Sequence, residues 1–201
     1  MSKLNRGSFF VQWVTAVTIT MILATMSAFM SMWSVGEVVQ QAWGDVPMAI
    51  VVGGIFGGLL SLGVGLGQAV VLRSQGIPFM RWLARTMLVG ALGMAIGFTL
   101  IFSLFDMENM PELVVGLTMS LSLGLPIGLV QAQLLKPHLA QAQLWVPICI
   151  VAFFISFAVG LPMSGEGREW LSLGMVALLT AVLTGIGIVW LARDEKTAVA
   201  V

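Results

Sequence analysis

The chain has 201 residues, of which 59% are hydrophobic and only 9% are charged, and its formal net charge is zero. Soluble domains carry charge on about a quarter of their residues, so this composition excludes an ordinary water-exposed surface and indicates a membrane protein. No basic run with interleaved aromatic residues occurs, which argues against nucleic-acid binding. The lone cysteine excludes an intrachain disulfide.

Six long apolar stretches follow one another along the chain, and each is long enough to cross a bilayer as a helix. The first stretch is too long for the apolar core of a cleavable signal peptide, so we interpret it as a retained helix. The connections are short, so residues 1–201 are expected to form a single integral membrane domain. The predicted spans are Phe9–Trp33, Pro47–Leu72, Arg81–Phe105, Pro111–Leu135, Gln141–Leu161 and Trp170–Ala192.

The charged residues sort by sign onto opposite sides of these spans. Positively charged connections stay in the cytoplasm, so the pattern predicts an all-α polytopic protein with both termini inside, in a bacterial inner membrane. Arg168, Asp194 and Glu195 are the exceptions to the pattern. The basic side carries Lys3, Arg6, Arg73, Arg81, Arg85, Lys136, Arg193 and Lys196, and the acidic side carries Glu37, Asp45, Asp106, Glu108, Glu112, Glu166 and Glu169.

The tryptophans fall near the predicted ends of the spans, where their amphipathic rings suit the headgroup level of a membrane. The sequence therefore predicts an aromatic belt at each interface. The inner belt would consist of Trp13, Trp82, Trp145 and Trp190, and the outer belt of Trp33, Trp43 and Trp170.

A short motif recurs where the even-numbered spans end. Gly65 and Gln68 precede Arg73 in the first copy, and residues 128–136 repeat this order 63 residues later. A degraded copy near Gly187 closes the sixth span without a glutamine. We predict three tandem helical hairpins, related by a pseudo-threefold axis along the membrane normal.

Small residues recur at helical spacing on several spans. In lipid, close packing along such faces replaces the hydrophobic drive between helices, so we expect contacts between helices there. A stripe that lines a pore is the alternative. The predicted packing residues are Gly54, Gly58, Gly65, Gly90, Gly97, Gly124 and Gly128.

Gln68 and Gln131 occupy equivalent positions of the repeat, on the same helix faces as the glycines. A buried amide in lipid has to find hydrogen-bond partners, so contacts between helices are the expected role. In the alternative, the two amides surround a shared polar pocket that binds a solute.

No catalytic or metal-binding constellation is visible in the sequence. No serine or cysteine has a histidine or carboxylate placed to activate it, and no carboxylate lies in the interior of a span, where one could couple transport to ions. We therefore predict no enzyme activity, no metal and no cofactor. Methionines gather toward the acidic side, where adaptable packing is a more economical interpretation than a copper site.

The Gly-x-x-Gln-Ala-x-x-Leu-Arg ending at 65–73, followed by Trp82, resembles poorly characterised bacterial multi-pass membrane proteins, and this resemblance implies no activity. The size, the six spans and the small-residue pattern at 24–28 also resemble the substrate-binding components of energy-coupling-type vitamin transporters.

Three functional hypotheses follow from the sequence. The first is a non-catalytic subunit that associates through its small-residue faces, either with itself or with another membrane protein. The second is a binding or transport component for a small neutral solute. The third is a subunit that binds lipid or pigment. The lipid bilayer is the one partner common to all three.

Overall fold

A computed structural model describes residues 5–104, 111–163 and 167–193. Within these ranges the chain forms helices and turns, and six helices are long and apolar enough to cross a membrane, which confirms the predicted fold class. The helices are α1 Arg6–Trp43, α2 Asp45–Leu72, α3 Phe79–Leu104, α4 Glu112–Leu135, α5 Trp145–Gly160 and α6 Glu169–Leu191. Short 3-10 turns follow α2 at Arg73–Gln75 and flank α5 at Ala142–Leu144 and Leu161–Met163.

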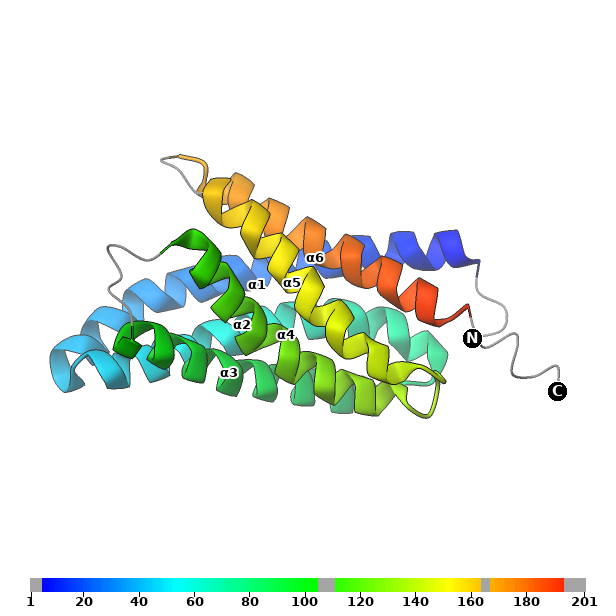
Figure 1. The fold of residues 1–201 in the computed structure, drawn as a ribbon, viewed down its shortest axis with the longest axis horizontal. Helices are drawn as coiled ribbons and strands as arrows, with labels where there is room; N and C mark the ends of the chain where they lie inside the picture. The colour runs from blue at the N-terminus through cyan, green and yellow to red at the C-terminus, as the bar shows by residue number, and fades with distance from the viewer. Residues whose placement is uncertain (1–4, 105–110, 164–166, 194–201) are drawn as a thin grey trace.

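The helices form a closed ring in chain order. Each packs against its neighbours along the chain, and α6 returns to pack against α1. Successive helices run in opposite directions, so α1 begins at the end of the bundle where α6 stops (Figure 1). We call this the terminal end and the opposite one, where α1 gives way to α2, the far end. The pseudo-threefold relation between hairpins stays a prediction.

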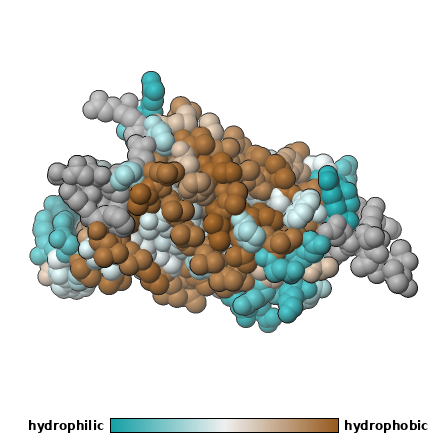
Figure 2. Space-filling view, in the orientation of Figure 1, coloured by the Kyte–Doolittle hydropathy of each residue, from teal (hydrophilic) through white to brown (hydrophobic). Residues whose placement is uncertain are grey.

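Polar and apolar surfaces separate along the length of the bundle. Figure 2 shows an apolar band across the middle of one face, with hydrophilic residues gathered toward the two ends. Many leucine, isoleucine and valine side chains of the helices are exposed, as expected where lipid chains replace water. Among the predicted charges, Lys3, Asp106, Glu108, Glu166, Asp194, Glu195 and Lys196 lie outside the described residues, as does the side chain of Glu112.

Helix α1 is longer than the sequence predicted. It continues past Trp33 to Trp43, so its 38 residues reach about 57 Å, well beyond an apolar core of about 30 Å. Residues 34–43 contain no proline, and Gln41 donates to Glu37 one turn earlier at 3.1 Å, which supports the helical extension. Gly44 ends the helix with a φ of +87°, a left-handed conformation that glycine adopts without steric cost.

Glycines on α2 allow it to approach two neighbours at once. A Cβ atom added at Gly57 would overlap the backbone oxygen of Gly90 on α3. A Cβ atom added at Gly67 would lie 2.6 Å from the Cα atom of Val17 on α1. Gly53 and Gly63 are equally close to α3 and α1, respectively. Helix α2 is therefore held between α1 and α3 through contacts that only glycine permits.

The seven glycines predicted to pack between helices lie at interfaces of different tightness. Gly90 and Gly97 face serine side chains of α2 and α4 so closely that an added Cβ atom would overlap them. At Gly124 and Gly128, added Cβ atoms would lie 2.8 and 2.9 Å from Cα atoms of α5. Gly65 is moderately close to Thr86, whereas Gly54 and Gly58 have room for a Cβ atom. The tightest face of α2 is thus displaced by one residue from the predicted one.

This difference gives a matched pair of variants on α2. Gly57→Ala should destabilise the protein by about 1–3 kcal/mol, because the added methyl group overlaps α3. Gly54→Ala should be neutral or stabilising, because its nearest neighbours are 4.0 Å away and alanine favours a helix. Unfolding midpoints in mixed micelles measure both effects. Equal stability of the two variants would contradict the close approach at Gly57.

Candidate functional site

The structure brings the two predicted glutamines together inside the bundle. The Nε2 atom of Gln131 donates to Oε1 of Gln68 at 2.7 Å and to Oγ1 of Thr86 at 3.0 Å. All three side chains are buried, and they come from α4, α2 and α3. The amides therefore join three consecutive helices of the ring.

Trp145 connects a fourth helix to these side chains. Its indole Nε1 donates to Oε1 of Gln131 at 2.8 Å from the first residue of α5. We call Gln68, Thr86, Gln131 and Trp145 the amide cluster. Both the nitrogen and the oxygen of Gln131 have partners within it, so the cluster satisfies this amide internally. Hydrogen bonds of this kind between membrane helices each contribute about 0.6 kcal/mol on average.

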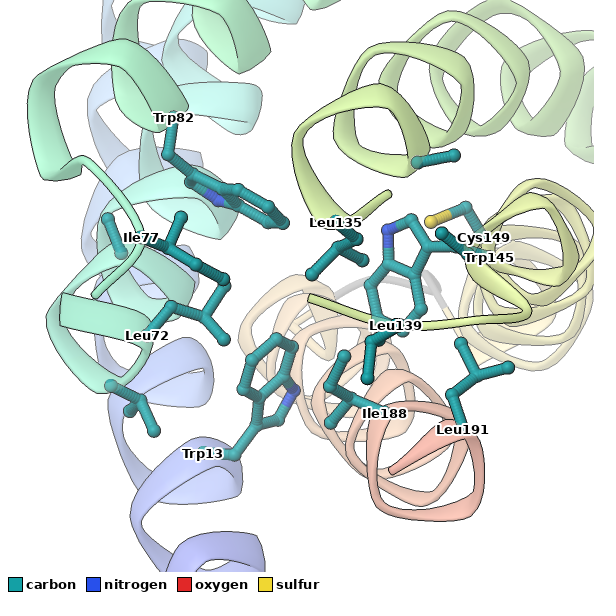
Figure 3. Packing of buried hydrophobic residues seen from close by; sticks show 14 of the residues in the cluster. Trp13, Leu72, Ile77, Trp82, Leu135, Leu139, Trp145, Cys149, Ile188 and Leu191 are labelled. Atoms are coloured by element: carbon teal, nitrogen blue, oxygen red, sulfur yellow. The ribbon is translucent and has the colours of Figure 1, made fainter. Parts of the chain in front are cut away.

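Three tryptophans predicted at the inner interface lie instead in the protein interior. Trp13, Trp82 and Trp145 are each 0% exposed, so the prediction that they belong to an aromatic belt is wrong. Figure 3 shows them among buried leucine and isoleucine residues, with each indole on a different odd-numbered helix. Indoles supply large apolar area, and these three, which lie within the first turns of their helices, fill the centre of the ring at this end.

The remaining tryptophans are exposed, as a belt requires. Trp33, Trp43, Trp170 and Trp190 are all accessible at the surface of the described structure. A tryptophan near the end of a span can face lipid or protein, and the linear sequence does not distinguish the two. Whether a tryptophan faces lipid or protein depends on which side of its helix it occupies, and on whether that side is turned toward the interior of the ring.

The buried indoles differ in their hydrogen bonds. Trp13 donates through Nε1 to Oγ1 of Thr184 at 3.1 Å, which ties α1 to α6, and its ring packs edge-on against Trp145 at a centroid distance of 6.1 Å. Trp82 has the same 14-residue separation from Gln68 that Trp145 has from Gln131. However, its Nε1 has no hydrogen-bond partner among the described residues. The two copies of the sequence motif therefore have the same residue spacing, but their indole groups do not form the same hydrogen bonds.

A pocket of about 700 Å³ lies in the far half of the bundle. Its walls come from α1 and α2 on one side and from α4, α5 and α6 on the other. Figure 1 shows α6 and α1 well separated at the far end, where these walls diverge. The buried side chains of Phe56 and Leu60 line the deep part, whereas the exposed Met30, Trp33 and Trp170 border its mouth. We call this cavity the far-end pocket.

The hydroxyl groups of the pocket wall donate hydrogen bonds to backbone carbonyl groups. The hydroxyl of Thr25 donates to the carbonyl of Met21 at 2.7 Å, and that of Ser172 donates to the carbonyl of Gly160 at 2.7 Å. Ser34 donates to the carbonyl of Met30 in the same way. Because the donors are used, the wall presents mainly methyl, thioether and aromatic groups. Among the described residues, Glu169 is the one ionisable side chain in the lining.

The sequence contained one signal for this pocket, which we interpreted as packing. The lining includes Met26, Met30 and Met119. In the sequence, methionines are concentrated toward the acidic side of the predicted spans, which is the far end of the bundle. Flexible thioether side chains are common on adaptable binding surfaces. The lining comes from five helices, so no local motif could have identified it.

Within the described residues, no group of three or more histidine, cysteine, aspartate or glutamate side chains is arranged to hold a metal ion. No protein-family model, curated protein or solved structure matches this chain. The two family resemblances stay predictions, and functional inference depends on the far-end pocket and the amide cluster.

The amide cluster predicts that Gln131 matters more for folding than a neighbouring glutamine. Gln131→Leu removes three hydrogen bonds and leaves the Trp145 indole without its partner, so it should cost about 2 kcal/mol of unfolding free energy. Gln133→Leu on the same helix is the control, because Gln133 is exposed. Reversible unfolding in mixed micelles measures both values. A difference below about 0.5 kcal/mol would show that the cluster adds little.

Proposed function

We propose that this integral membrane protein binds a molecule with an apolar chain, such as a lipid, in the far-end pocket. The observation that carries this proposal is the cavity itself: about 700 Å³ between two groups of helices, with a buried floor and an exposed mouth. Pockets that bind small molecules have volumes of about 300–1,000 Å³ and mostly apolar walls. The binding is non-catalytic in this proposal.

The chemistry of the wall favours an apolar chain over a water-soluble solute. The hydroxyl donors of Thr25, Ser34 and Ser172 are directed to backbone carbonyls, which leaves few donors for a polar ligand. A solute would have to exchange its own hydrogen bonds with water for weaker contacts with methionine and phenylalanine. An acyl or isoprenoid chain loses no hydrogen bonds when it enters the pocket, because it moves from lipid into an equally apolar cavity.

The amide cluster supports the solute-binding alternative less well. Gln131 already has partners for its nitrogen and its oxygen, and Gln68 accepts one of these hydrogen bonds. A solute would have to break bonds between helices before it could bind there. The two amides are better suited to fixing α2, α3, α4 and α5 relative to one another.

The small-residue faces give little support to the hypothesis of an associating subunit, because they are already used for contacts within the chain. Gly57, Gly67, Gly93 and Gly124 contact other helices of the same chain too closely to admit a side chain. A partner helix would need comparable glycine faces on the outside of the ring. A partner protein or a second copy of the chain would then have to bind through larger apolar side chains.

The pocket proposal predicts that filling the cavity abolishes binding. Met26→Trp adds a bulky ring to the α1 wall, so the number of lipid chains retained per protein through purification should fall from about one to near zero. Leu23→Trp is the control, because Leu23 is exposed on the same helix and does not line the pocket. Native mass spectrometry in a neutral detergent counts the retained chains. Equal retention by both variants would contradict the proposal.

The orientation in the membrane follows from the charges at the two ends. The terminal end carries Arg6, Arg73, Arg81, Arg85, Lys136 and Arg193, whereas the far end carries Glu37, Asp45 and Glu169 with only Arg168 as a described basic residue. By the positive-inside bias, the terminal end faces the cytoplasm of a bacterial cell. The pocket mouth then lies toward the outer leaflet of the inner membrane.

Cysteine labelling tests this orientation, because the native Cys149 is buried. Asp45→Cys should react with an impermeant maleimide added outside spheroplasts, since residue 45 is exposed at the far end. Ser74→Cys should react only after the membrane is opened, since Ser74 is exposed at the terminal end. The wild-type chain controls for reaction at Cys149. Labelling of both variants from the same side would overturn the assignment.

A further inference from the structure

The mouth of the far-end pocket combines one acidic and two aromatic side chains. Glu169 and Trp170 are the first residues of α6, and Trp33 lies on α1; all three line the pocket and are exposed. We call them the mouth residues. They are the part of the lining that a polar headgroup would meet when an apolar chain occupies the interior.

We infer that the far-end pocket selects an amphiphile whose headgroup carries a positive charge, an inference that rests on the proposed function. Such a headgroup would be an amine or a quaternary ammonium, as in a cationic or zwitterionic lipid. The mouth residues would contact it while its chain extends toward Phe56 and Leu60.

The carboxylate of Glu169 supplies the first argument. Its Oε1 accepts a hydrogen bond of 3.3 Å from the backbone of Gly167, and no basic side chain lies within 4.0 Å of it in the described part of the chain. The adjacent Arg168 is exposed but forms no ion pair with it there. The charge at the mouth is therefore not neutralised by the described residues. Glu169 stands in the first turn of α6, where the helix dipole interacts favourably with negative charge.

Other charges near the mouth act in the same direction. Glu37 lies one helical turn beyond Trp33 and is exposed, with Gln41 as its hydrogen-bond partner. Asp45 begins α2 at the same end of the bundle. The described far end therefore has more acidic than basic side chains, and its potential attracts a cation and repels an anionic headgroup.

The two tryptophans supply the second argument. The faces of indole rings attract ammonium groups, and cages of aromatic residues recognise quaternary ammonium ligands. Trp33 and Trp170 border the same cavity mouth from two helices that are far apart in the sequence. A belt tryptophan needs only to reach the headgroup level, whereas these two also border a cavity that has a carboxylate in its lining.

The experiment compares amphiphiles that share one alkyl chain and differ only in the headgroup. We would use an alkyltrimethylammonium, an alkyl sulfate and an alkyl maltoside, and measure their dissociation constants for the purified full-length protein in neutral-detergent micelles. The wild-type protein should bind the ammonium form about tenfold more tightly than the maltoside, and the sulfate most weakly. The preference should shrink as salt is added, because exposed charges are screened.

Glu169→Gln should weaken binding of the ammonium form about threefold and leave binding of the maltoside unchanged. Glu37→Gln is the matched comparison, because it removes one acidic charge at the same end from a residue that does not line the pocket, and it should weaken binding of the ammonium form less than Glu169→Gln does. Trp33→Leu provides a second variant, and its side chain is 83% exposed, so folding should tolerate the change. It should lower the ammonium preference by a similar factor.

The outcomes separate this inference from the function on which it rests. Equal binding of all three amphiphiles, or tightest binding of the sulfate, would overturn the headgroup inference while leaving chain binding in place. An unchanged ammonium preference in both Glu169→Gln and Trp33→Leu would also overturn it. If no amphiphile binds the wild-type protein more tightly than the Met26→Trp variant, the proposed function fails as well.

Discussion

The close approach of α2 to α1 and α3 is the constraint on which the rest of the bundle depends. Lipid chains are as apolar as leucine, so helices in a membrane gain little from hiding apolar side chains and associate through packing instead. At Gly57 and Gly67 the backbones come near enough that a methyl group would overlap α3 or α1. Three helices are thereby fixed as a unit, and the remaining three close the ring around them.

The two halves of the bundle are packed in different ways. The terminal half contains three fully buried indoles and the amide cluster, whose hydrogen bonds are directional and connect four helices. The far half is packed mainly by Met21, Phe56, Phe153 and other apolar side chains, and its hydrogen bonds from Ser172 to Gly160 and from Thr180 to Ser156 join only α6 to α5. Directional bonds specify one arrangement, whereas thioether and aromatic contacts tolerate several. A rigid terminal half can therefore support a far half that admits a ligand.

The helices themselves could be predicted from the sequence, because length and apolarity define a membrane span without reference to its neighbours. The extension of α1 to Trp43 was missed because apolarity ends at Trp33 while helix propensity does not. Membrane span and helix are separate properties, and hydropathy reports only the first.

The candidate site was only partly predictable. The sequence predicted that Gln68 and Gln131 would form hydrogen bonds between helices, since buried amides in lipid need partners, but it did not predict that the two would bind each other. The burial of Trp13, Trp82 and Trp145 did not follow, because position along a helix says nothing about which side of it faces lipid. The glycine faces show the same limit: Gly54 and Gly57 differ by less than one turn, yet only Gly57 is at the tight contact.

The location of the pocket follows from how the ring closes. Helices α1 and α6 are the first and last of the described helices, and no short loop connects one to the other. At the terminal end they are joined by the hydrogen bond from Trp13 to Thr184 and by the packing of Gly185 against Phe10 and Trp13. Farther along, the extended α1 and the start of α6 separate, and the cavity fills the space between their groups of helices (Figure 1). A ring tied at one end and open at the other presents its interior to a lipid chain without unfolding any helix.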